Sequence, residues 1–246
     1  EQALAEAQRL GYAEADPSKD IDSRDAAAEM AILARLAFDT PVRLDQVTYE
    51  GIEHIQPDDL EYAHELGLEL KLLGTAERIG EGLSVRVHPA FLYPGHPLAS
   101  VSGPFNAVTV ESDAITEITM SGPGAGGSQT ATAVLGDVIS AMIPPASTPL
   151  TSQVLEIVAD VVSSFYLHLE VADEPGVLAA VAQALAEHRV SVKSVVQKGL
   201  GEQARLVMVL HPVLESQFFA ARQTISDLDV LRAPPRAIRV IEEEFG

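Results

Sequence analysis

Five carboxylates lie close together near the start of the chain. Residues 11–29 read GYAEADPSKDIDSRDAAAE, and the acidic residues that precede or begin the apolar segment are Glu14, Asp16, Asp20, Asp22 and Asp25. Carboxylates at this density before a helix either interact with the positive end of its dipole or line a pocket that binds a cation. The residue types alone leave both interpretations open.

A further carboxylate, Glu29, follows Asp25 by one helical turn. The segment AAAEMAILARLAF predicts a helix over residues 25–38, so that Asp25 and Glu29 point from the same face. Two like charges at this spacing destabilise a helix by roughly 0.2–0.5 kcal/mol when both are solvated. Glu29 is therefore either a solvated helix residue or a functional group beside Asp25.

Helices and strands alternate around these residues. We expect the helix over 25–38 to bury Ala26, Met30, Leu33 and Ala37, and Pro41 follows its end. Alternating β-branched residues, interrupted by Gly and Pro, predict several strands beyond this helix. The expected elements are a strand over 43–55 with a turn at Gly51, a helix over 57–66, strands over 69–80, 83–92, 106–112 and 115–122, and a helix over 130–142.

The pattern changes after residue 142. The uncharged segment IPPASTPLTS, rich in Pro, Ser and Thr, opens a predicted linker over 143–163 that separates a domain over 1–142 from one over 164–246. Beyond it the expected order is strand, helix, strand, strand, helix, strand, which is the ferredoxin-like βαββαβ order. The fold class predicted for the whole chain is α+β.

The first half resembles homoserine dehydrogenases. The resemblance is carried by GYAEADP followed by Asp20 and Asp25, and it continues in family order through ELKLLGTAERI, VRVHPAFL, HPLASVSGPFNAV and GPGAGGSQTATAVLGD. It implies a mixed-sheet substrate-binding and dimerisation domain. Glu14 and Asp20 match family residues that hold polar groups of the substrate, and carboxylates suit its ammonium group.

Two positions in the segment over residues 11–29 depart from the family pattern. Ser23 stands where the family has Gly, and Glu29 stands where the family has a Lys placed for proton transfer at the substrate hydroxyl. The resemblance implies catalytic positions at Asp25 and Glu29, but a Glu cannot supply a cation. The 246-residue chain by itself is therefore expected to be inactive as a dehydrogenase.

The family reaction requires NAD or NADP, yet no strand in the sequence is followed by GxGxxG. We expect the nucleotide-binding domain to be absent from these residues. The segment PGAGG offers Gly124, Gly126 and Gly127, which the resemblance places near the cofactor. The alternative is a tight turn into the helix over 130–142.

The second half resembles the ACT domain, a regulatory module that binds amino acids between paired copies. The turn from its first strand to its first helix reads DEPGVL, and its second strand reads VSVKSVVQKG. Free N–H groups at the helix start can hold a carboxylate. The expected effector-binding residues are Asp173, Gly176, Val177, Leu178, Ser194 and Gln197, with threonine as the effector implied by the family. The alternative is a domain that only pairs subunits.

Composition excludes several classes of protein. The net charge is −20, with 16 Lys and Arg against 36 Asp and Glu, which disfavours nucleic-acid and anionic membrane partners. No Cys is present, and the His residues have no metal-ligand spacing, so no metal site is predicted. No signal-peptide pattern opens the sequence, so we expect a cytoplasmic protein.

Three functions remain open from the sequence. The first is the substrate-binding and regulatory part of a homoserine dehydrogenase, in the pathway to threonine and methionine, that forms a dimer or tetramer. The second is a non-catalytic, amino-acid-binding regulatory protein derived from that family. The third is a scaffold that only dimerises.

Overall fold

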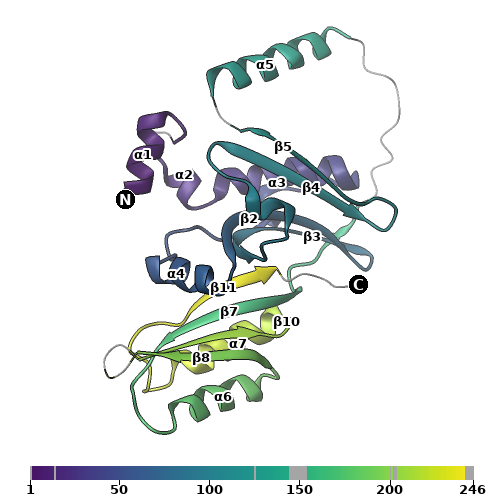
Figure 1. Ribbon diagram of the computed structural model, residues 1–246. Helices are drawn as coiled ribbons and strands as arrows, with labels where there is room; N and C mark the ends of the chain where they lie inside the picture. The colour runs from purple at the N-terminus through teal and green to yellow at the C-terminus, as the bar shows by residue number, and fades with distance from the viewer. Residues whose placement is uncertain are drawn as a thin grey trace.

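The computed structural model describes residues 2–13, 15–124, 126–143, 154–199, 201 and 204–241. Figure 1 presents the arrangement of its helices and strands. In the first half the elements are α1 (Gln2–Leu10), α2 (Ser18–Ile21), α3 (Arg24–Phe38), η1 (Leu44–Gln46), β1 (Thr48–Tyr49), α4 (Pro57–Glu65), β2 (Glu69–Ile79), β3 (Gly82–Leu92), η2 (Pro97–Ser100), β4 (Phe105–Ser112), β5 (Thr116–Pro123) and α5 (Gly127–Ala141).

The second half has the βαββαβ order that the sequence predicts, with two short extra strands, β6 and β10. Its elements are β6 (Glu156–Ile157), β7 (Val162–Glu170), α6 (Val177–Glu187), β8 (Val192–Lys198), β9 (Arg205–Leu210), β10 (Val213–Leu214), α7 (Glu215–Ser226) and β11 (Arg236–Ile241). The fold is a mixed α+β arrangement, as expected.

One nine-stranded sheet runs through both halves. Its main path is β1-β3-β11-β7-β9-β8, with β2 and β6 also paired to β3 and β10 to β7. The last strand, β11, makes the connection, because it pairs antiparallel with β7 and parallel with residues 90–92 of β3. β3 is the centre of the fold and all eleven of its residues are buried.

Helices cover this sheet on both faces. α6 and α7 pack on the β7–β9 region through the largest core cluster, which includes Val181, Phe218 and Leu206. α4 contributes Tyr62 and Ala63 to a second cluster with Tyr166 and Val207, on strand positions that alternate with those of the first cluster. The C-terminal sheet therefore lies between its own helices and α4 from the first half, as Figure 1 shows.

Helix α3 packs through its smallest residues. Ala27, Ala31 and Ala34 are buried against β3, and this spacing differs from the expected inward face. Ala26 and Met30 do pack on the same cluster, but Leu33 is 40% exposed and Ala37 is exposed, so that part of the prediction is wrong. Alanine lets the helix approach the sheet closely, which turns the larger side chains outward.

Two other expectations need correction. Only residues 48–49 of the strand expected over 43–55 are extended and paired, because the chain turns away at Gly51. Within the expected linker, β6 pairs with β3, whereas residues 144–153 lie outside the described part of the chain. The boundaries of the two domains remain a proposal.

Candidate substrate and effector sites

The acidic segment folds as two short helical pieces. Asp16 Oδ1 accepts a hydrogen bond from the Ser18 N–H at 3.2 Å, and Asp22 Oδ1 accepts one from the Arg24 N–H at 2.9 Å. These two acids therefore act at the starts of α2 and α3, which is one of the two roles expected for the group. Glu14 lies outside the described residues.

The remaining acids of the segment are available to a ligand. Asp20 lies on α2, Asp25 lies in the first turn of α3, and Glu29 lies one turn later, all with exposed side chains. Asp25 and Glu29 lie on a different face of α3 from Ala27 and Ala31, which pack inward. The structure therefore leaves these three carboxylates free to meet a cationic group from solvent.

Ser23 adopts a conformation that glycine would take without strain. It precedes α3 with φ of 65°, in the left-handed region, although its side chain is buried. Among the described residues, no group forms a hydrogen bond with its hydroxyl. A glycine here would remove both the Cβ and the buried hydroxyl, which gives a physical reason for the Gly that the family resemblance places at this position.

The segment after β1 contacts the backbone of the acidic segment and connects it to the sheet. The Ile52 N–H donates to the Ile21 carbonyl at 2.9 Å, and the Glu50 N–H donates to the Val87 carbonyl on β3 at 2.9 Å. A Cβ on Gly51 would lie only 2.6 Å from the Ile21 carbonyl oxygen. The close approach therefore requires glycine, and it ties the backbone that carries Asp20 and Asp22 to the sheet.

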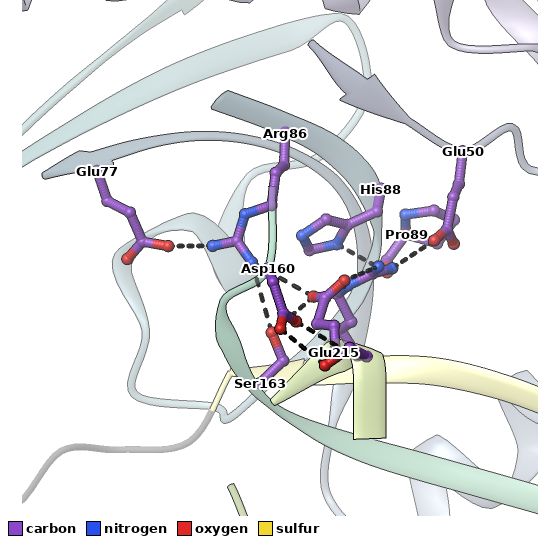
Figure 2. Close-up of polar contacts among 10 residues, drawn as sticks. Glu50, Glu77, Arg86, His88, Pro89, Asp160, Ser163 and Glu215 are labelled. Carbon is purple, nitrogen blue, oxygen red and sulfur yellow. Dashed lines mark hydrogen bonds and ion pairs between the residues drawn. The ribbon is translucent and has the colours of Figure 1, made fainter. Parts of the chain in front are cut away.

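A buried ion cluster lies where β3, β11 and the start of α7 meet (Figure 2). The Arg239 guanidinium on β11 donates from Nε and Nη2 to the two Glu215 carboxylate oxygens, both at 2.7 Å, and from Nη1 to Glu50 Oε1 at 2.8 Å. Ser163 Oγ donates to Glu215 Oε1 at 2.8 Å. Residues from both halves of the chain thus share one buried network.

Arg86 of β3 completes this cluster on its other side. Its Nη1 lies 3.4 Å from Glu215 Oε1, its Nη2 pairs with Glu77 of β2, and its Nε has no partner among the described residues. Burial raises the pKa of the Glu215 carboxyl, but hydrogen bonds from Arg239 and Ser163 and the charge of Arg86 outweigh it and hold the pKa below its usual range. Glu215 is therefore ionised at neutral pH.

His88 is the neutral member of the same region. Its ring Nδ1 lies 3.2 Å from the Pro89 carbonyl oxygen and its side chain is buried. Burial, and then the positive charges of Arg239 and Arg86, lower the pKa of His88 to about 3. A cation at this position would have two guanidinium groups as neighbours, so the imidazole stays uncharged.

A second buried cluster joins α4 to the C-terminal sheet. His168 Nδ1 lies 3.3 Å from Asp59 Oδ1, and Arg236 of β11 contacts both residues, with Nη2 2.8 Å from His168 Nδ1. Burial raises the pKa of the Asp59 carboxyl, but His168, the Gln56 N–H and Arg236 outweigh it and lower the pKa overall. β11 therefore carries two arginines that pair with carboxylates from elements outside the strand, Arg239 buried and Arg236 half-buried.

The glycine segment before α5 forms one exposed helix start. Gly126 has φ of 126°, a backbone conformation that other residues rarely adopt, so glycine is favoured at this turn. A Cβ on Gly124 would collide with Asn106, whereas Gly127 has open space around it. β5 pairs antiparallel with β4, and β6, the next described strand after α5, pairs with β3 and not with β5. Among the described residues, these glycines therefore do not lie in a βαβ unit of the kind that binds dinucleotides.

The expected effector residues lie around the turn into α6 and on β8. Gly176 has φ of 96° and open space around it, Val177 is buried in the core, and Leu178 is 43% exposed. Asp173 Oδ2 accepts a hydrogen bond from the Gly201 N–H at 2.8 Å. Because any side chain at position 176 would be strained in this conformation, a bulky substitution there tests backbone strain as much as ligand space.

The two strand residues of this group lie on opposite faces of β8. Gln197 pairs with Leu206, whose side chain belongs to the core cluster under α6 and α7. Ser194 pairs with Val209, which alternates with that set and shares the face of Val207 toward α4. Gln197 therefore shares the side of α6 and Gly176, and Ser194 does not.

The buried arginines and their partners were not anticipated from the sequence. A signal for them does exist, because Arg86 and His88 interrupt the apolar strand LSVRVHPAFL and Arg239 interrupts AIRVI. A charged residue at a strand centre must find a partner, but the strand sequence does not identify that partner.

Among the described residues, no group of three or more His, Asp or Glu side chains is arranged to hold a metal ion. No helix in that part of the chain is long and apolar enough to cross a bilayer.

An α+β domain joined through one continuous sheet to a ferredoxin-like βαββαβ domain is the class that this fold defines. The homoserine dehydrogenase family matches residues 1–139, and the ACT domain family matches residues 165–230. The chain belongs to the homoserine dehydrogenase family and carries an ACT domain.

Similar proteins support this assignment across the whole chain. "Homoserine dehydrogenase" of Mycobacterium tuberculosis strain H37Rv is 40% identical over 256 residues, which cover 97% of this chain and 58% of that protein. The Synechocystis protein of the same name is 41% identical, with 98% and 60% covered. A crystal structure of a homoserine dehydrogenase from Thiobacillus denitrificans superposes with a TM-score of 0.89 at 36% identity and covers 98% of this chain and 58% of that one. The chain thus spans about three fifths of the length of these relatives.

Proposed function

We propose that this chain is the substrate-binding and regulatory part of a homoserine dehydrogenase, which interconverts aspartate semialdehyde and homoserine with NAD or NADP. The observation that carries the proposal is the exposed group of Asp20, Asp25 and Glu29 on α2 and α3. It lies in the segment that resembles the family's substrate-binding loop. We propose a cytoplasmic location, in accord with the composition.

The proposed roles follow from charge and position. Asp20, together with Glu14, holds the substrate ammonium through charge-assisted hydrogen bonds. Asp25 accepts a hydrogen bond from the substrate hydroxyl at the start of α3. Glu29 takes the position of the family Lys, where an ionised carboxylate can accept a proton but cannot stabilise a developing negative charge.

The nicotinamide cofactor supplies the hydride in the family reaction. The segment with Gly124, Gly126 and Gly127 offers free N–H groups at the start of α5, which suit a phosphate, but it supplies only one edge of such a site. We therefore propose that cofactor binding needs groups beyond the described residues.

A titration with substrate analogues tests the substrate proposal. We expect L-homoserine to bind the 246-residue chain with measurable heat in isothermal titration calorimetry. 4-Hydroxybutyrate, which lacks the ammonium group, should bind at least about tenfold more weakly, because a charge-assisted hydrogen bond is lost. Equal affinity for the two compounds would contradict an ammonium site made of carboxylates.

A rate measurement tests the expected lack of dehydrogenase activity in these residues by themselves. We expect the 246 residues by themselves to show no NADPH oxidation with aspartate semialdehyde, for want of both a dinucleotide cradle and a cation at position 29. Turnover that follows the purified chain through two independent columns would contradict this expectation.

We further propose that the ACT domain binds a small amino acid, with threonine as the first candidate, at the start of α6. The N–H groups of Leu178 and Ala179, in the first turn of α6, would receive the carboxylate, and Gln197 lies on the same side of the sheet. The second candidate function is a non-catalytic regulatory protein that binds an amino acid. It is favoured if threonine binds and homoserine does not.

A further inference from the structure

The guanidinium of Arg239 has a fixed orientation. Two of its nitrogens, Nε and Nη2, are held by the Glu215 carboxylate, and its carbon lies 5.6 Å from the centre of the Phe165 ring. Arg239 is only 4% exposed, so no water competes for most of its surface. Its third nitrogen, Nη1, is therefore aimed at one place, and the group found there is Glu50 Oε1 at 2.8 Å.

Glu50 lies directly before the residues that contact the candidate substrate loop. Its N–H is bonded to the Val87 carbonyl on β3, so its backbone is anchored to the sheet and its side chain to β11. The next residue, Gly51, touches the Ile21 carbonyl, and Ile52 donates a hydrogen bond to it. Ile21 directly follows Asp20, and the same turn leads into Asp25.

We propose that Arg239 is a positioning residue for substrate binding, which acts through Glu50 on the backbone of residues 20–23. The proposal rests on the function proposed above. Arg239 touches no residue of the candidate substrate group, so its effect passes through one side-chain contact and one close backbone approach. A carboxylate-lined site needs its groups held within a fraction of an ångström, and a small displacement of the loop weakens every contact it makes.

The same contact couples the two domains. Arg239 lies on β11, which pairs with β7 of the ACT domain on one side and with β3 on the other. A change in the position of β11 would therefore reach the substrate loop through the ion pair between Arg239 and Glu50. This gives the ACT domain a physical route to the loop that requires no movement of the sheet as a whole.

Glu77 provides a matched control for Glu50. Each carboxylate pairs with one buried arginine of the same cluster, Glu50 with Arg239 and Glu77 with Arg86. Their side chains are similarly exposed, at 36% for Glu50 and 40% for Glu77. Glu77 lies on β2, away from the segment that touches Ile21, so its loss removes an equivalent ion pair without releasing the loop.

The test compares Glu50→Ala, Glu50→Gln and Glu77→Ala in the 246-residue chain. Hydrogen exchange of peptides covering residues 18–25 and 48–55 reports on the loop, and calorimetry with L-homoserine reports on affinity. We expect Glu50→Ala to accelerate exchange in both peptides and to weaken homoserine binding by about tenfold, as misplaced binding groups do. Glu50→Gln keeps an acceptor for Arg239 and should restore most of both properties. Glu77→Ala should leave both within about twofold of the starting chain.

Exchange and affinity separate this proposal from the proposed function. If Glu50→Ala leaves exchange at residues 18–25 unchanged, or if Glu77→Ala accelerates it equally, the positioning role is overturned. If the starting chain does not bind homoserine, the proposed substrate is wrong, while the exchange comparison still decides whether Arg239 and Glu50 hold the loop. Equal melting temperatures of the two alanine variants would confirm that the pair is matched in stability.

Discussion

His88 connects the buried ion cluster to the pH dependence of folding. Burial, and then Arg239 and Arg86, hold its pKa at about 3, well below the usual value for histidine. Between about pH 6.5 and pH 3 the unfolded chain therefore binds a proton that the folded chain does not. Above that window, protonation of His88 does not affect the free energy of unfolding. As pH falls through the window, the free energy of unfolding decreases by about 1.4 kcal/mol per pH unit because of this residue.

Replacing His88 should remove this dependence. Between pH 7 and pH 5.5, the free energy of unfolding of His88→Gln should fall by about 1 kcal/mol less than that of the starting chain. Urea unfolding at both pH values measures this difference. His211→Gln, at an exposed position, is the control and should follow the starting chain. Parallel pH profiles for His88→Gln and the starting chain would show that His88 does not resist protonation.

Ser23 gives a second prediction at the scale of a residue. Its φ of 65° and its buried hydroxyl, which has no hydrogen-bond partner in the described part of the chain, both cost free energy. We expect Ser23→Gly to raise the free energy of unfolding by about 1 kcal/mol, since the left-handed strain is removed and part of that gain is offset by glycine's entropy. Ser23→Ala keeps the Cβ and removes only the hydroxyl, so it separates the two causes. A melting temperature that falls in Ser23→Gly would contradict the strain argument.

Gly51 is the point at which two elements touch by their backbones. A Cβ at this position would lie 2.6 Å from the Ile21 carbonyl oxygen, which is backbone and cannot turn aside. We expect Gly51→Ala to destabilise the fold by about 1–3 kcal/mol, as overpacked contacts do. Gly136→Ala is the control, because it adds a Cβ in open space within α5 and should be neutral or stabilising. Thermal unfolding of both variants measures the difference. Equal shifts in their melting temperatures would contradict a close backbone contact between Gly51 and Ile21.

Periodicity predicted the elements better than it predicted their contacts. The strands at residues 69–79 and 82–92 and the βαββαβ order were clear from alternation and from Gly and Pro. The inward face of α3 was not clear from the sequence. We expected its large apolar residues to point inward, but alanines allow the helix to pack closely against the sheet. The strand expected over 43–55 was mostly wrong, since its pairing ends where Gly51 meets Ile21, a contact between segments distant in sequence.

The exposed edge of the sheet bears on the assembly of the molecule. β8 pairs only with β9 among the described strands, and its Val195 and Val196 are exposed. An unpaired edge with apolar side chains is open to pairing with a second copy. We expect a dimer or tetramer in multi-angle light scattering at micromolar concentration. A single species at the 26.2 kDa mass of the chain would count against this expectation.

The junction between the two halves could not be predicted from the sequence. Arg239 and Glu215 belong to the C-terminal half, and Arg86, Glu50 and Glu77 to the first half, so their meeting depends on the pairing of β11 with β3. The proposed substrate residues, in contrast, come from a short local segment, since Asp20, Asp25 and Glu29 need only two neighbouring helices to place them. A local segment is thus enough to propose a site, whereas the long-range network required the structure.

The proposed function depends on whether the carboxylates on α2 and α3 bind the substrate amino acid. The decisive experiment is calorimetric titration of L-homoserine into the starting chain, Asp20→Asn, Asp25→Asn and the control Asp113→Asn, in the exposed turn between β4 and β5. We expect binding by the starting chain and by Asp113→Asn, with affinity weakened at least about tenfold in the other two variants, because each loses a charge-assisted hydrogen bond. Unchanged affinity in Asp20→Asn and Asp25→Asn would contradict the proposed substrate site.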